Sequence, residues 1–408
     1  MKKLKHWLTP LMLLGVSQAQ GANQEIKALF QPDPSMPWKN EFINQTPNSG
    51  YCAIYPEQCS DNKTFSIQMP IRFHTITPMS LNEGVWIKAP AQWRSLTVTN
   101  PETQQTSTVE VRISGIGSVF RLSRPVTELT GIADILEAHR KLWTTSSWVN
   151  APPPCQYSGV GAYTPSTYRF FWKTPQSGSC NKIAAFNVGH MSFEHLDVAY
   201  ELRTPNPLAM SAGVYRGSLT YSVGRVAADF NMGPLFDSDD ANLTLDFVLD
   251  VQHTLKVDLP PGGNRIALEP EGGWQPWLNT RRIPERLYRD QTFHISASSR
   301  FKMYLDCGGT ATSEYCFLYN DNQSSYAAMG VSVTLPGGLT DTGGRPVRRQ
   351  RLRPHEVNAV VFQPGIYVDR QQGTLHFDVE KNSIARILTA DKGNKYSQTV
   401  IVVFDSEI

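Results

Sequence analysis

Two stretches of sequence, GVYRGSLTYSVGRV at residues 213–226 and NLTLDFVLDVQHTLKVDL at residues 242–259, decide the fold. In the second stretch, apolar residues occupy every other position from Leu243 to Val251, with mostly polar residues between them. This spacing is the period of a β-strand with one buried face. After residues 252–254 the same alternation resumes at Leu255. We therefore predict that the last strand of one β-domain runs through a very short linker into the first strand of a second.

The composition fits an all-β chain of two domains. A length of 408 residues is enough for two domains, and 29 Gly with 28 Pro are typical of many short strands and turns. We predict two β-sandwich domains in tandem, with an N-terminal domain at 20–250, a linker at 251–254 and a C-terminal domain at 255–408. The formal net charge of +2 indicates no nucleic-acid partner and no attraction to an anionic membrane surface.

The first residues have the pattern of a secretory signal. Lys2, Lys3 and Lys5 precede an apolar run at 7–16, and small residues follow it up to Ala19. We predict a signal peptide at residues 1–19 and export of the mature chain. No later segment approaches the roughly 20 apolar residues that a membrane-spanning helix needs.

Export makes a disulfide framework the expected use of the six cysteines. They fall into neighbouring pairs along the chain, each of which closes a local loop. A metal site is the alternative, but none of the pairs has CxxC spacing or flanking histidines. The predicted disulfides are Cys52–Cys59, Cys155–Cys180 and Cys307–Cys316.

Other segments carry weaker signals. Residues 20–50 show little periodicity and predict an irregular lead-in, whereas the alternation at 65–73 predicts a strand. The spacing of apolar residues at 128–143 predicts one amphipathic helix of about four turns. The closing segment 398–404 is apolar on both faces, so we expect it to be covered from both sides. Without a partner, such a strand would aggregate.

The sequence offers little chemistry of an enzyme or a metal protein. It lacks the nucleophile elbow, the phosphate loop, the zinc-protease motif and the EF-hand loop. His190, Glu194 and His195 come nearest to a site, but in a strand the two histidines would point to opposite faces. The carboxylates at 237–240 lack the spaced ligands of a calcium loop. The arginines at 345–353 predict a solvated basic loop, with a contact for an acidic partner as the alternative. We predict neither catalysis nor a cofactor or metal.

The order of several motifs resembles one family. GVYRGSLTYSVGRV is followed by LTLDFVLDVQHTLKVDLPPGG, SRFKMYLD, GVSVTLPGGLTDTGGRPV, GTLHFDVEKN and YSQTVIVVF. Together they are similar to the tip adhesin and initiator subunits of class 5 (alternate chaperone-usher) fimbriae, typified by the colonisation factor antigen I tip adhesin and the cable-pilus initiator. The resemblance covers most of the chain after residue 205 and, before it, only the cysteine layout.

The resemblance implies an immunoglobulin-like fold for both domains and an incomplete C-terminal pilin domain. In the family, a periplasmic chaperone first fills the place of the missing strand. At the outer-membrane usher, the N-terminal extension of the next subunit, a major pilin, replaces the chaperone. This donor-strand complementation supplies main-chain hydrogen bonds and side-chain pockets. The resemblance places this subunit at the fimbrial tip on the cell surface.

The resemblance also implies candidate receptor-binding residues. The family uses a basic patch centred on an arginine in the strand that follows a Gly-Val-aromatic motif. Arg225 occupies that position here, and Arg216 and Tyr215 belong to the same segment. Val226 stands where the family has a second arginine. Arg225 is therefore either an anchor for an acidic sugar, which a guanidinium grips well, or a plain surface residue.

Three functions follow from these observations. The first is a tip adhesin that initiates pilus assembly and binds a host glycan or glycoprotein. The second is a pilus initiator without receptor binding, which the valine at position 226 favours. The third is a secreted carbohydrate-active enzyme, for which no paired carboxylates stand out at a readable spacing.

Overall fold

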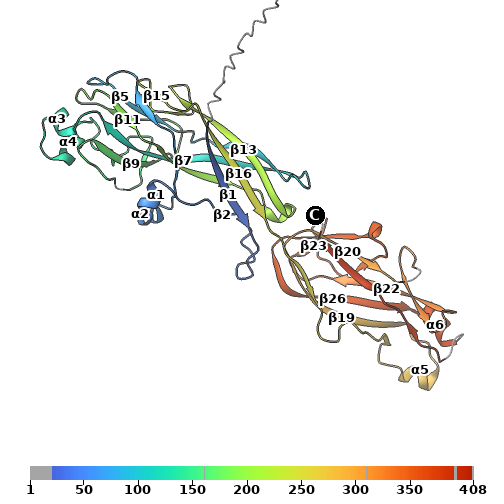
Figure 1. Ribbon diagram of the computed structural model, residues 1–408. Coiled ribbons are helices and arrows are strands. Elements are labelled where there is room, and N and C mark those ends of the chain that lie inside the picture. Colours follow the sequence, from blue (N-terminus) through green and yellow to red (C-terminus); the bar gives the residue numbers. More distant parts are fainter. Residues whose placement is uncertain (1–20, 160, 309–310, 390–392, 407–408) are drawn as a thin grey trace, which may run out of the picture.

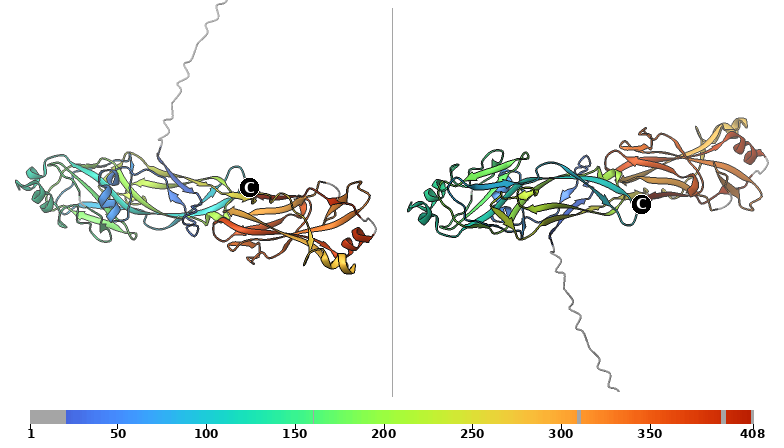
Figure 2. Two further views of the ribbon diagram at one scale, coloured as in Figure 1. Left: turned by 90° about the horizontal axis from the view of Figure 1, so that it is seen from below. Right: turned by 90° about the horizontal axis from the view of Figure 1, so that it is seen from above.

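Two β-sandwiches lie end to end in an elongated molecule (Figure 1). The computed structural model describes residues 21–159, 161–308, 311–389 and 393–406. The views in Figure 2 show the same rod from two further sides. The prediction of an all-β fold with tandem sandwiches is confirmed. The signal peptide predicted at 1–19 lies outside the described residues. None of the helices within the described ranges is long and apolar enough to cross a membrane.

The first sandwich encloses a core whose buried residues run from Ala22 to Val251. Its strands form one continuous network, with β7 at the centre and β1, β16 and β13 side by side near the junction with the second sandwich. The elements are β1 (Ala22–Phe30), β2 (Ile43–Asn44), α1 (Tyr51–Ile54), α2 (Pro56–Asp61), β3 (Ile67–Met69), β4 (Phe73–Thr75), β5 (Gly84–Lys88), β6 (Arg94–Thr99), β7 (Thr106–Leu122), α3 (Val126–Thr130), α4 (Ile135–Lys141), β8 (Gln156–Tyr157), β9 (Thr167–Lys173), β10 (Ser179–Ile183), β11 (Met191–Phe193), β12 (Leu196–Arg203), η1 (Pro207–Ala209), β13 (Gly213–Gly224), β14 (Phe230–Asn231), β15 (Phe236–Ser238) and β16 (Asn242–Val251).

The segment that was expected to be irregular contains a long strand. β1 pairs in parallel with β16 along nine positions, from Ala22 opposite Leu243 to Phe30 opposite Val251. The prediction for residues 20–50 is wrong in this part. Four residues of β1 are buried, and two of them are the alanines Ala22 and Ala28. Of these four, only Ile26 and Phe30 are strongly apolar, so the alternation in the sequence is weak. The pairing with β16 covers this strand and compensates for its low apolar content.

The predicted helix at 128–143 is two short helices, α3 and α4, at the far end of the first sandwich. Gly131 ends α3 in the left-handed conformation with φ of 73°, which glycine adopts without steric cost. Asp134 then caps α4, because its carboxylate accepts a hydrogen bond of 2.8 Å from the backbone N–H of Glu137. The helical spacing of apolar residues therefore continues in the sequence, although Gly131 and Asp134 divide the helix in two.

The structure pairs the six cysteines in the way that their order along the chain predicts. Cys52–Cys59 joins α1 to α2, and these helices cover part of the outer face of the first sandwich. There Tyr51 stacks on Phe171 at a ring distance of 4.9 Å. The other two bridges are Cys155–Cys180 and Cys307–Cys316.

The second sandwich packs an eight-stranded sheet against a four-stranded sheet within the described residues. The large sheet has the order β17-β19-β26-β22-β21-β27, and the small sheet has the order β23-β25-β20-β28. The elements are β17 (Leu255–Asp258), β18 (Glu269–Pro270), α5 (Gln275–Thr280), β19 (Arg286–Ala297), β20 (Phe301–Asp306), β21 (Cys316–Asn320), β22 (Tyr326–Thr334), β23 (Leu339–Asp341), β24 (Gln350–Leu352), η2 (Glu356–Asn358), β25 (Val360–Pro364), β26 (Val368–Glu380), α6 (Lys381–Thr389), β27 (Tyr396–Ser397) and β28 (Ile401–Ser406).

A histidine in the linker joins the two sandwiches. The Nε2–H of His253 donates to the carbonyl of Met210 in the first sandwich at 2.8 Å, and its Nδ1 lies 3.1 Å from the hydroxyl of Ser298 in the second. The same hydroxyl accepts the backbone N–H of Thr254 at 2.8 Å. Because the Met210 carbonyl needs a donor, the network assigns a proton to Nε2, and in the neutral imidazole Nδ1 then accepts the Ser298 hydroxyl.

We expect His253 to titrate below the ordinary histidine value of about 6.5. Burial lowers its pKa, while the bond to the Met210 carbonyl opposes this shift. The neutral form thus stabilises the fold above pH 6.5 or so, and this contribution is lost as the pH falls through the lower pKa of the folded state. NMR titration of the imidazole, with the denatured chain as reference, measures both values. Ser298→Ala should raise the folded midpoint, because Nδ1 loses its hydroxyl donor. A folded midpoint at or above the denatured one would contradict the network.

Candidate functional site

A polar depression lies on the outer face of the first sandwich, over β4, β11 and the segment that follows β15. Its volume is about 650 Å³, and its charged and titratable lining residues come from three segments far apart in the sequence. These residues are Arg72, His74, Glu194, His195 and Asp239.

Strand alternation builds this face. Phe73, Phe193 and Phe236 point inward and are fully buried, so their neighbours along each strand point outward. The registers of β4 with β11 and with β15 place His74 opposite both Ser192 and Asp237. The result is a row of polar side chains that crosses three strands. Such a row can bind hydroxyl and charged groups of a ligand through hydrogen bonds.

Arg225 lies just after β13, at the edge of this face. Its guanidinium donates to Asp237 at 3.1 Å, and the side chains of Arg225 and Asp237 are 59% and 40% exposed. Because Asp237 stands opposite His74, the Arg225–Asp237 pair borders the depression. An exposed pair of this kind contributes little to stability, so the arginine is available for a ligand at low cost.

The structure does not bring the other two candidates to this site. Arg216 is exposed in the middle of β13, nine residues before Arg225, which at about 3.3 Å per residue places the two roughly 25–30 Å apart. Tyr215 is fully buried, and its hydroxyl bonds to Gln105 and Ser211. Its ring cannot contact a receptor from this position, which corrects the expectation for Tyr215. Strand alternation alone would have shown that Tyr215 and Arg216 face opposite sides.

The histidines and carboxylates considered for a metal have other partners. His190 bonds to the hydroxyl of Thr75 at 3.1 Å, and Glu194 pairs with Arg121. The carboxylates at 237–240 also bond to different partners: Asp237 pairs with Arg225, and Asp239 accepts the backbone N–H of Arg72. Within the described residues, no group of three or more His, Cys, Asp or Glu side chains is placed to hold a metal ion.

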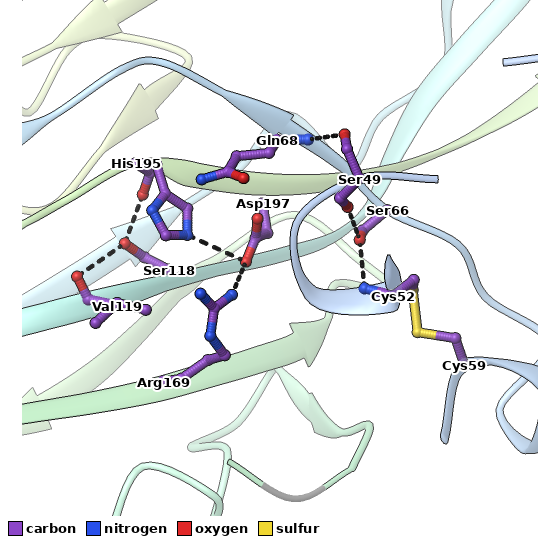
Figure 3. Close-up of polar contacts among 10 residues, drawn as sticks. All are labelled: Ser49, Cys52, Cys59, Ser66, Gln68, Ser118, Val119, Arg169, His195 and Asp197. Atoms are coloured by element: carbon purple, nitrogen blue, oxygen red, sulfur yellow. Dashed lines mark hydrogen bonds and ion pairs between the residues drawn. A yellow bond between two sulfur atoms is a disulfide. The ribbon is translucent and has the colours of Figure 1, made fainter. Parts of the chain in front are cut away.

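A buried charged cluster adjoins the depression (Figure 3). Asp197 is fully buried in β12, and its carboxylate lies 3.1 Å from Arg169 of β9 and 3.4 Å from Nε2 of His195. Gly117 of β7 stands between these strands, directly beside Asp197 in register. An added Cβ at Gly117 would come within 2.5 Å of the Phe171 ring, so the glycine allows Phe171 of β9 to pack directly against β7. His195 thus belongs both to the cluster and to the lining of the depression.

No local sequence pattern indicates this cluster. Asp197 and Arg169 are 28 residues apart, and only the order of β9, β7 and β12 brings them together. Gly50 lies beside this carboxylate with a φ of 66°, and an added Cβ there would come within 1.9 Å of Asp197 Oδ1. Only glycine fits beside this buried carboxylate.

The arginines at 345–353 lie in and beside β24, and most of them are paired. Arg345 pairs with Asp341, Arg351 with Asp378 and Arg353 with Glu314. Local carboxylates therefore neutralise most of this basic segment, which favours the interpretation as a solvated loop.

The second sandwich has an open edge at β28. This strand pairs with β20 on one side and ends the order of the four-stranded sheet among the described residues. Its segment IVVF is apolar, yet Ile401 is 53% exposed and the next three residues are only half-buried. Phe404 and Val402 pack against the core, and the Phe404 ring lies 5.4 Å from that of Phe293.

The first strand of the second sandwich has the same character. β17 pairs with β19 alone among the described strands, and it ends the order of the eight-stranded sheet. Leu255 and Val257 pack against the core but are only half-buried. Two sheet edges thus expose apolar side chains together with unpaired backbone groups, which is the geometry that accepts an added strand.

No known family model and no curated protein sequence matches the chain. Among solved structures, the chain is similar to CfaE, the adhesive subunit of CFA/I fimbria of enterotoxigenic Escherichia coli, with 11% identity, 95% of this chain and 99% of that chain covered, and a TM-score of 0.25. It is also similar to the CFA/I chaperone-tip adhesin complex, with 12% identity, 95% and 97% covered, and a TM-score of 0.26. A third structure is the CsuC-CsuE chaperone-tip adhesion subunit pre-assembly complex of Acinetobacter baumannii, with 8% identity, 94% and 98% covered, and a TM-score of 0.22. These proteins are chaperone-usher tip adhesins, the class that the sequence motifs resemble.

Proposed function

We propose that this chain is a tip subunit of a chaperone-usher fimbria, with an N-terminal adhesin domain at 20–250, a linker at 251–254 and a C-terminal pilin domain at 255–408. The observation that carries this proposal is the open edge of β28, an apolar strand that the second sandwich leaves half-buried. A strand supplied by a partner would pair with β28 and cover its apolar side chains. In this proposal the periplasmic chaperone supplies that strand first, and a major pilin replaces it at the usher.

The pairing of β1 supports a terminal place in the fibre. Residues 22–30 are paired along their whole length with β16, so this segment is not available to fill an acceptor in another subunit. The subunit therefore accepts a strand through β28 but donates none through β1. A subunit with this property belongs at the tip, where it initiates assembly after export through the periplasm.

The test of assembly is hydrogen exchange in β28 of the full mature chain. Co-expression with the periplasmic chaperone should give a stable complex in which the amides on both edges of β28 are protected. The chain without a chaperone should aggregate or show fast exchange at the amides that face away from β20. A stable monomer with all of β28 protected would contradict the proposal.

We propose the polar depression, with Arg225 at its border, as the receptor site for a host glycan or glycoprotein. Arg225→Ala should abolish cell binding by the assembled tip and change the free energy of unfolding by less than about 1 kcal/mol, because its ion pair is exposed. Arg353→Ala is a matched control in the second sandwich, since the pair of Arg353 with Glu314 is also 3.1 Å long and similarly exposed. Unchanged binding by Arg225→Ala would remove Arg225 from the site.

An initiator without receptor binding is the second candidate function. The burial of Tyr215 and the valine at position 226 favour it, because they reduce the number of groups that could grip a receptor. Fimbriae that assemble normally but bind no host cells, in the wild type as well as in the Arg225 variant, would establish this function.

A further inference from the structure

A second depression lies on the first sandwich, beyond the helices α1 and α2. Its volume is about 480 Å³, within the range of roughly 300–1,000 Å³ that small-molecule sites occupy. It is lined by the turn after α2, by β2 and by the outward residues of β7, β9 and β12. It has no lining residue in common with the depression beside Arg225.

Two lysines make this depression cationic. Lys63 is in the turn after α2 and Lys173 ends β9, and neither has an ion-pair partner among the described residues. Glu201 is the one carboxylate in the lining, and Arg112 compensates it with two hydrogen bonds of 3.0 and 2.7 Å. The two ammonium groups are therefore available to an anion that enters the depression.

Aromatic rings form another wall. Phe65 meets Tyr200 edge to face, with 4.6 Å between the ring centroids, and Phe65 is only half-buried. The residue Tyr200 is 5% exposed, and burial raises the pKa of its hydroxyl to about 12, so the hydroxyl stays protonated at neutral pH. Apolar ring surface of this kind packs against the C–H faces of a sugar ring.

An oriented amide completes the site. The Oδ1 of Asn44 receives the backbone N–H of Thr46 at 2.9 Å and the hydroxyl of Tyr200 at 3.2 Å. The backbone N–H of Thr46 can only donate, so the oxygen of Asn44 faces it and the Nδ2 group of Asn44 is turned away, whereas the single hydroxyl proton of Tyr200 is shared between Asn44 and the Thr46 hydroxyl at 3.0 Å. Asn44 is exposed and lines the depression, so Nδ2 offers two donors to a ligand.

From this combination we infer that the depression binds an acidic sugar, with its anionic group between Lys63 and Lys173, its ring against Phe65 and a hydroxyl or acyl oxygen on Asn44. This inference names a ligand class for the first sandwich and rests on the proposed adhesive role only for its biological purpose. The anion can be a carboxylate or a sulfate ester, because a lysine ammonium is a point charge that suits both.

Binding to the soluble full-length chain, in complex with the chaperone if that is the stable form, tests the inference without any adhesion assay. The probes are N-acetylneuraminic acid, galactose 6-sulfate and neutral galactose, followed by ligand-observed NMR and calorimetry. We expect one of the two acidic sugars to bind, more weakly at high salt, and galactose to bind at least tenfold more weakly. Which acidic sugar binds identifies the anion.

Charge removal in the site is the decisive comparison. The double variant Lys63→Gln/Lys173→Gln should weaken binding of the acidic sugar at least tenfold, whereas Lys88→Gln on β5 should leave it unchanged. Lys173→Arg should retain binding, and circular dichroism verifies the fold of each variant. Binding that survives the double substitution, equal binding of neutral galactose or no binding of either acidic sugar would overturn the inference.

The two proposals fail in different ways. If the fimbria adheres to cells but the soluble chain binds no acidic sugar, the adhesive role stands and this site does not. If the soluble chain binds the sugar through Lys63 and Lys173 but fimbriae do not adhere, the site stands and the receptor role is lost.

Discussion

Replacing Arg169 with methionine is expected to lower the free energy of unfolding of the first sandwich by about 3–5 kcal/mol, the cost of leaving a buried charge without its partner. Arg169 lies 3.1 Å from the carboxylate of Asp197, which is fully buried. One oxygen of Asp197 has no hydrogen-bond partner among the described residues, and Nε2 of His195 only approaches the other at 3.4 Å, so the carboxylate depends on Arg169. Chemical denaturation of the purified chain, with the transition of each sandwich resolved, measures this loss.

Two further variants show whether the loss comes from the unpaired charge. In Arg169→Met/Asp197→Leu both charges are gone, so most of the lost stability should return, as it does when apolar residues replace a whole buried ion pair. Arg121→Met breaks an exposed pair with Glu194 and should cost no more than about 1 kcal/mol. An Arg169→Met variant that is as stable as Arg121→Met would show that the cluster is not important for the fold.

Replacing Lys182 with methionine is the second large effect, with an expected loss of about 2–4 kcal/mol. Lys182 is fully buried in β10, and its Nζ lies within 3.2 Å of the backbone carbonyls of residues 145, 146, 147 and 150. Burial lowers the pKa of Lys182 to about 7, whereas the four carbonyl oxygens favour the charged amine. Without the amine, these oxygens lose their donor and the loop after α4 loses its anchor.

The same loop carries Trp148, which stacks on Trp172 at 5.2 Å between ring centroids and accepts its indole N–H through the backbone. Near-ultraviolet circular dichroism should therefore change in Lys182→Met together with the unfolding midpoint. Lys88→Met on the adjacent strand β5 is the control, and we expect a change within roughly 0.5 kcal/mol. A Lys182→Met variant with an unaltered midpoint would contradict the role of the four carbonyl bonds.

The sequence predicted the strands with strong alternation. β16 follows the apolar period from Leu243 to Val251 because it buries one face, and β17 repeats the period from Leu255 with its apolar residues half-buried against the core. The disulfide pairs followed from proximity along the chain. β1 was not predicted because its apolar alternation is weak. Its pairing with β16 stabilises it, and a contact between segments so far apart leaves no local sequence pattern.

The candidate sites depended on register and on strand order, which the sequence leaves open. His74 and Asp237 stand opposite each other only because β4 and β15, 163 residues apart, are neighbours. Arg225 was found through the family resemblance, whereas the depression beside it, the buried Asp197 and the pair of lysines in the second depression required the structure. Tyr215 was misassigned because the motif was transferred without regard to which face of β13 each residue occupies.

The parallel pairing of β1 with β16 has a mechanical consequence. Tension that pulls the two sandwiches apart leaves the first one through Val251, along the axis of β16. This strand is held by the ladder with β1 on one side and the antiparallel ladder with β13 on the other. Because ladder hydrogen bonds lie across the strands, such a pull shears them all at once instead of opening them one by one. Under tension, the first sandwich therefore releases β16 only when both ladders fail together.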